Sequence, residues 1–194
     1  MPEERRGPVV IERAPGRPRS EDARLAVLHA VDDLLLEVGY AAMTMKGIAE
    51  RAGVGRQTVY RWWPTKAHIL IEACAADARG ELAVTPSTEP ARTVTDFLDA
   101  LSRFLTDSPA GAAYRALLGE AQHDPAVRDL MAQEDLLAAP ARVVLDSLRT
   151  QLAMVPLDDE MAVAELCGPL VLAALSGRRL KTDALAAHLV HAWA

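Results

Sequence analysis

Aromatic residues are scarce in this sequence, at 4% of the chain. Alanine and leucine are common instead, a balance that favours helix over strand. No apolar run reaches the length of about 18 residues that a transmembrane helix needs, so we expect no membrane-spanning segment. The polar, arginine-rich start, from Met1 to Ser20, also lacks the apolar core and small-residue cleavage site of a secretory signal.

Cysteine is nearly absent as well. Cys74 and Cys167 each sit in an apolar run, and neither belongs to a CxxC pair. A disulfide framework and a zinc cluster are therefore poorly supported, and two small buried residues in a reduced, cytoplasmic protein are favoured.

Motifs of enzymes and metal sites are lacking too. We find no P-loop, GxSxG or dinucleotide fingerprint, so we expect neither an enzyme nor a cofactor. Glu120 with His123, and His188 with His191, have the i, i+3 spacing of helical metal ligands. Neither pair has an evident third ligand, so we predict no metal site.

Charge is distributed unevenly along the chain. Residues 1–70 hold 11 basic and 9 acidic residues, a net of +2, whereas residues 71–194 hold 10 and 18, a net of −8. The two parts together give the net charge of −6. An acidic protein can still bind DNA if its basic groups gather on one face, and the acidic part is then expected to have another task.

Helical periodicity dominates the first half of the sequence. We expect a flexible arginine-rich arm over 1–19, then a helix capped by Ser20 and ended by Gly39. Thr44 can cap a second helix that stops at Gly53, and short helices are then expected over 56–62 and 65–82, separated by a break at Trp63–Pro64.

The second half follows a linker over 84–90 and is also predicted to be helical. The expected helices cover 91–106, 109–121, 125–152, 159–176 and 183–192. Pro140 should kink or divide the long third segment, and Thr182 can cap the last helix. No alternating strand pattern occurs, so the predicted fold class is all-α.

The most informative stretch is TMKGIAERAGVGRQTVYRWWPTK, from Thr44 to Lys66. Two short helices separated by AGVG form a helix-turn-helix, in which Gly53 supplies the positive φ of the turn. Ile48, Val54 and Val59 are expected to lock the two helices together.

The remaining side chains of the third helix should face outward, which is what reading of the DNA major groove requires. Arginine can fork to guanine, glutamine can pair with adenine, and threonine or tyrosine can contact phosphate. Lysine at the start of the next helix can reach a phosphate, and two residues that begin the second helix can do the same. The predicted DNA-binding residues are Thr44, Lys46, Arg56, Gln57, Thr58, Tyr60, Arg61, Trp62 and Lys66. Trp63, in contrast, is expected in the core.

These residues resemble the tetracycline-repressor (TetR) family of bacterial transcriptional regulators. The similarity runs from about Arg17 to Glu72 and includes Ile48–Ala49, Ala52–Gly55, Thr58–Val59–Tyr60, Trp63 and Thr65–Lys66. The resemblance implies an N-terminal three-helix DNA-binding domain, assigned here to 20–66. It also implies a C-terminal helical domain over 67–194 that dimerises and binds a small-molecule effector. Dimer contacts are expected in 141–152 and 161–175.

We expect the effector site to be a mainly apolar pocket after Pro90 that takes a small lipophilic molecule. The reason is that three aromatics, Phe97, Phe104 and Tyr114, fall within one predicted helical pair, with Tyr114 and His123 as polar anchors. The predicted lining is Phe97, Leu101, Phe104, Tyr114, Leu117, Leu118, His123, Met131 and Cys167. A packed core without a cavity is the alternative.

Two functions remain open at this point. In the first, a homodimer binds a double-stranded operator and a small molecule releases it. In the second, the C-terminal domain only dimerises or docks a protein partner, so DNA binding is constitutive or protein-regulated. A cavity in that domain favours the first.

Overall fold

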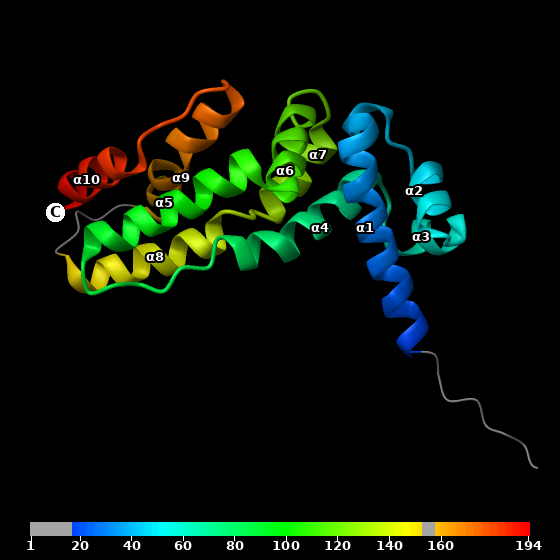
Figure 1. Ribbon diagram of the computed structural model, residues 1–194, viewed down its shortest axis with the longest axis horizontal. Helices are drawn as coiled ribbons and strands as arrows, with labels where there is room; N and C mark the ends of the chain where they lie inside the picture. The colour runs from blue at the N-terminus through cyan, green and yellow to red at the C-terminus, as the bar shows by residue number, and fades with distance from the viewer. Residues whose placement is uncertain (1–16, 153–157) are drawn as a thin grey trace, which may run out of the picture.

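A computed structural model describes residues 17–152 and 158–194 (Figure 1). These residues form helices and no strand, so the predicted all-α fold is confirmed. The helices are α1 Arg17–Ala42, α2 Met45–Ala52, α3 Arg56–Trp62, α4 Lys66–Glu81, α5 Pro90–Asp107, α6 Pro109–Glu120, α7 Pro125–Gln133, α8 Ala138–Gln151, α9 Asp159–Leu175 and α10 Thr182–Trp193. Within the described residues, no helix is both long and apolar enough to cross a membrane.

The helices form a small N-terminal head and a longer bundle, which lie at opposite ends of Figure 1. In the head, α2 packs against α1, and α3 packs against α2. Gly39 interrupts α1 with a φ of 76°, where a helix stop was predicted. The expected start at Ser20 is wrong, because α1 already begins at Arg17. The rest of the predicted arm, 1–16, lies outside the described residues.

Two apolar cores hold the molecule together. The first is built mainly from α1 to α4 and extends into α6 and α7 through Ala113, Leu117 and Val127. The second joins α5, α8, α9 and α10. Helix α4 contributes Cys74 to the first core and Ala78 to the second, so it connects the two.

Helix α5 is the centre of the bundle, because its buried face contacts α6, α8, α9 and α10. Its contact with α6 is unusually close. A Cβ atom on Gly111 of α6 would lie 2.6 Å from the carbonyl carbon of Phe104 and 3.1 Å from the Cα of Leu105. Only a glycine allows the two helix backbones to approach this far.

Two predicted boundaries in this half are wrong. The long predicted segment is divided at 134–137 rather than at Pro140, because the Asp135 carboxylate accepts the backbone N–H groups of Leu137 and Ala138 and starts α8 there. Pro140 then lies in the first turn of α8, where proline is tolerated. Thr182 does not cap α10 either, since its hydroxyl bonds to Asp99 instead.

Candidate functional site

The turn between α2 and α3 has the local geometry that the sequence predicts. The Thr44 hydroxyl accepts the Gly47 N–H at 3.0 Å and caps α2. Gly53 ends α2 in the left-handed region, with φ 65° and ψ 25°, and its N–H bonds back to Ala49 and Glu50. A side chain at Gly53 would strain this turn, since only glycine enters the region freely.

Apolar contacts then fix the angle between the two helices. Ile48, Ala49 and Val59 are fully buried, and Val54 packs against the same core. This confirms the predicted locking contacts. With Val59 facing inward, the adjacent positions of α3 face solvent.

The outward face of α3 carries polar and basic side chains. Arg56, Gln57, Tyr60 and Arg61 are exposed, and Tyr60 is an aromatic with 55% of its surface accessible. Thr44 and Lys46 are also exposed beside them, at the start of α2, whereas Thr58 is half-buried. The structure therefore brings most of the predicted DNA-binding residues onto one pair of short helices.

One acidic residue on this surface was not anticipated. The Glu50 carboxylate accepts from the Arg56 guanidinium at 3.1 Å and lies 3.8 Å from the Lys46 ammonium. Glu50 therefore holds two of the predicted DNA-binding cations, and a phosphate or guanine would have to compete with it. The i, i+4 spacing of Lys46 and Glu50 could have suggested the contact between these two residues.

Lys66 has an internal role that sequence reasoning missed. Its ammonium donates to the carbonyl oxygens of Tyr40 at 2.7 Å and Met43 at 3.1 Å, and lies 4.1 Å from the centroid of the Tyr40 ring. Partial burial lowers the pKa of Lys66, while the Glu120 carboxylate opposes this shift. The side chain thus ties the end of α1 to the start of α4. Its predicted phosphate contact stays a prediction.

The two tryptophans were only partly predicted correctly. Trp63 is buried as expected, and its indole N–H donates to Glu72 at 2.6 Å. Trp62 was expected to be exposed, but it is half-buried because its ring packs edge-on against Trp63 at a centroid distance of 5.5 Å. The Arg61 guanidinium lies over the Trp62 ring, 5.9 Å from its centroid.

Known proteins share this arrangement of helices. Residues 27–73 match the family described as bacterial regulatory proteins, tetR family. This segment belongs to the TetR family. Over 109 residues it is 38% identical to the HTH-type transcriptional regulator YdeS of Bacillus subtilis, a match that covers 56% of this chain and 54% of YdeS.

Other relatives extend this comparison. The transcriptional repressor KstR of Rhodococcus jostii is 32% identical over 46% of this chain and 43% of its own. The chain thus spans about half the length of these curated relatives. The solved TetR family regulator SCO0332 aligns with 89% of this chain and 99% of its own at 26% identity and a TM-score of 0.73. RolR, crystallised with resorcinol, shares the fold at 18% identity and a TM-score of 0.65, over 92% of this chain and 90% of RolR.

The predicted effector pocket was largely wrong. Phe97, Leu101 and Phe104 are fully buried in the second core, where they pack against other side chains. Leu117 is fully buried in the first core, and His123 is exposed. Leu118 and Met131 are half-buried and pack against the cores. Aromatic spacing on a helix therefore indicated packing rather than a cavity.

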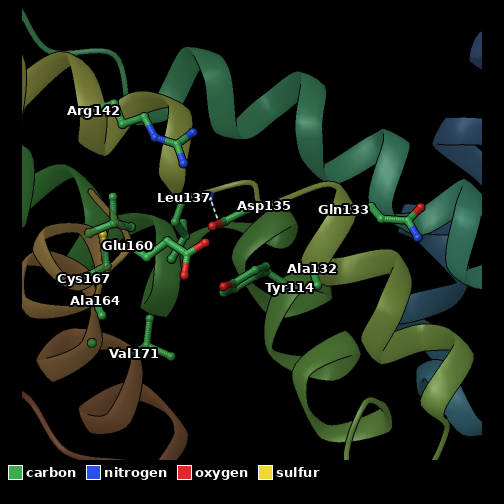
Figure 2. Close-up of a pocket in the computed structure, with 12 residues that line it drawn as sticks. Tyr114, Ala132, Gln133, Asp135, Leu137, Arg142, Glu160, Ala164, Cys167 and Val171 are labelled. Carbon is green, nitrogen blue, oxygen red and sulfur yellow. Dashed lines mark hydrogen bonds between the residues drawn. The ribbon is translucent and has the colours of Figure 1, made fainter. Parts of the chain in front are cut away.

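The structure has a cleft of about 580 Å³ elsewhere in the C-terminal domain, and it includes two of the predicted residues, Tyr114 and Cys167 (Figure 2). It is formed by α6, α7, α8, α9 and the segment before α8. Its lining is Tyr114, Ala132, Gln133, Asp135, Leu137, Arg142, Glu160, Val163, Ala164, Cys167, Gly168 and Val171. The volume suits a drug-sized molecule, but the walls are more polar than predicted.

The environment of the cleft raises the pKa values of two of its side chains, Tyr114 and Cys167. Burial raises the pKa of the Tyr114 phenol above its usual value, and the nearby Asp135 carboxylate raises it further. The same two causes raise the pKa of Cys167 to about 12. Both side chains are therefore neutral at pH 7, while Asp135 places negative charge beside them. The chain has no sequence motif that would have indicated this grouping.

Apolar side chains also lie exposed on α8 and α9, which pack against each other. Val143, Met161, Leu172 and Leu175 are each more than half exposed. Several other apolar residues in the predicted dimer segments, including Val144, Leu148 and Leu166, are instead fully buried within one chain.

Proposed function

We propose that this protein is a transcriptional regulator that binds a DNA operator through α2 and α3. One observation carries the proposal: the outward face of α3 presents Arg56, Gln57, Tyr60 and Arg61 while Val59 anchors the helix from behind. A helix held in this way can enter the major groove and read base edges. The similarity of the chain to the repressor KstR and to the regulator YdeS supports this proposal.

We further propose that the protein acts as a homodimer. Four large apolar side chains on α8 and α9 are more than half exposed, and contact with a second copy would remove them from water. In such a dimer the two α3 helices would read half-sites about one DNA turn apart, roughly 34–36 Å.

A small effector is expected to regulate binding. A ligand that prefers a head spacing different from that on DNA shifts the population of dimers away from the operator. The cleft of about 580 Å³ is the site where we place this ligand. The presence of this cleft favours a repressor that a ligand releases from DNA. The alternative is a protein whose C-terminal domain only dimerises or docks a protein partner.

The test begins with selection of bound duplexes from a random DNA library by the full-length protein. Fluorescence anisotropy then measures Kd for the selected operator and for a scrambled duplex. We expect Arg56→Ala and Gln57→Ala to cost about 1–3 kcal/mol each on the operator and to relax sequence preference.

Arg103→Ala and Gln122→Ala make the same chemical changes at exposed positions of the C-terminal domain and should leave Kd unchanged. Equal affinity of the α3 variants and the wild type, or equal binding of the scrambled duplex, would contradict the proposal.

A further inference from the structure

The cleft in the C-terminal domain has an unusual set of charged walls. Asp135 comes from the segment before α8, Glu160 from the first turn of α9, and Arg142 from α8. Within the described residues, neither Glu160 nor Arg142 takes part in any of the ten ion pairs. Their charges are therefore available to a ligand.

The two carboxylates and the phenol converge. Figure 2 shows the carboxylate of Glu160 and the hydroxyl of Tyr114 directed toward the middle of the cleft, with the Asp135 carboxylate above them in this view and Arg142 farther away. Asp135 is close enough to Tyr114 for its charge to raise the pKa of the phenol. This corner thus combines two negative charges with an aromatic ring, a combination that attracts cations.

Apolar atoms line the wall beside this corner. Val163, Cys167 and Val171 lie on α9, which also carries Glu160. An organic molecule can therefore place a hydrocarbon part against α9 while its charged end remains near the carboxylates. Burial holds Cys167 as a neutral thiol, so this wall adds no charge of its own.

We propose that the cleft binds an organic cation, with a protonated amine between Asp135 and Glu160 and an apolar body against Val163 and Val171. The inference rests on the proposed function for its regulatory meaning, but the binding event itself does not require DNA. Arg142 at the edge disfavours a second cationic group, so the preferred ligand carries a single positive charge.

Isothermal titration calorimetry with three molecules of one shape tests the charge preference. The probes are para-butylbenzylamine, para-butylbenzyl alcohol and para-butylbenzoate, which are cationic, neutral and anionic at pH 7. We expect the amine to bind at least about tenfold more tightly than the alcohol, as hydrogen bonds to charged groups predict. The benzoate should bind most weakly. Tighter binding of the alcohol or benzoate, or no saturable binding of the amine at millimolar concentration, would overturn the proposal.

Charge-neutralising variants locate the site. Glu160→Gln should weaken amine binding about tenfold, and Asp135→Asn, which retains an oxygen to cap α8, should weaken it similarly. Arg142→Gln removes one charge from the same cleft and is the matched control: it should leave amine binding unchanged or tighten it. If Arg142→Gln weakens binding while Glu160→Gln does not, the cleft prefers an anion and the proposal is wrong.

The effect on DNA separates this inference from the proposed function. Amine binding that depends on Glu160 but leaves the selected operator bound would support the cation site and contradict release by an effector. Absence of sequence-specific DNA binding would contradict the proposed function and leave the calorimetric result to decide the site. If the amine releases the operator from the wild-type protein but not from the Glu160→Gln protein at the same amine concentration, both proposals are supported.

Discussion

Replacing Gly111 by alanine tests the closest contact in the fold. The new methyl group would point at the backbone of α5, where its distance of 2.6 Å from the Phe104 carbonyl carbon falls short of an ordinary 3.4 Å contact by 0.8 Å. It would lie closer still to the Phe104 oxygen. Because the opposing atoms are backbone, no side chain can rotate away, and α5 and α6 must separate.

The magnitude follows from two opposing effects. Overpacking of a well-packed core costs typically about 1–3 kcal/mol, and a clash between two helix backbones belongs at or above the upper end. Alanine in place of a helical glycine returns about 1 kcal/mol through helix propensity. We therefore expect Gly111→Ala to lower the free energy of unfolding by about 2 kcal/mol or more, which corresponds to a Tm lower by roughly 4–8 °C.

Gly119 provides the matched control, since it lies on the same helix and an added Cβ would meet nothing within 4 Å. Gly119→Ala should therefore leave the protein as stable as the wild type, or raise its stability by up to about 1 kcal/mol. Urea unfolding followed by circular dichroism, at one protein concentration for all three proteins, measures the difference. Equal stability of Gly111→Ala and Gly119→Ala would refute the close-approach argument.

Three further outcomes are expected. Burial and the Asp77 carboxylate raise the pKa of Asp32 to about 6, so the folded chain binds this proton more tightly than the unfolded chain, whose aspartate titrates near 3.8. Stability from this group should fall as pH rises from about 4 to about 6, and urea unfolding across that range should show a smaller decrease for Asp32→Asn. Lys66→Met should lower the free energy of unfolding by about 1–3 kcal/mol, because two partly buried carbonyl groups lose their donor; unchanged stability would contradict the internal role. Leu172→Arg should yield monomers by light scattering, whereas Leu36→Arg, at a similarly exposed position on α1, should not; a dimeric Leu172→Arg protein would argue against the α8–α9 interface.

Local signals were sufficient to predict the turn between α2 and α3. Thr44 and Gly53 form their cap and turn with neighbours three or four residues away, so the sequence contains all the information that these contacts need. Ile48 and Val59 followed from helical periodicity in the same short stretch. Lys66 did not, because its carbonyl partners lie 23 and 26 residues earlier and depend on how α1 ends against α4.

The cleft in the C-terminal domain was harder to predict for the same reason. Whether Phe104 packs into a core or borders a cavity depends on how closely α5 and α6 approach, and this distance depends on Gly111. The cleft itself is formed by elements from Tyr114 to Val171 in the sequence. No pattern within one helix places Glu160 opposite Tyr114. The hydrogen bonds that start α8 at Asp135 are local, but the break was predicted at Pro140 and these bonds were missed.

The sharing of α4, α6 and α7 between the two apolar cores limits where this protein can be cut for a chimera. A segment cut after Lys66 would lose Leu70, Cys74 and Leu117, side chains that complete the apolar interior beneath the first three helices. Such a fragment is expected to be poorly folded. Fusing it to an unrelated effector domain would leave the buried apolar side chains of α1 without their packing partners. A functional chimera should instead exchange only the exposed residues of α2 and α3. The buried residues of both helices, and the core beneath them, then stay unchanged.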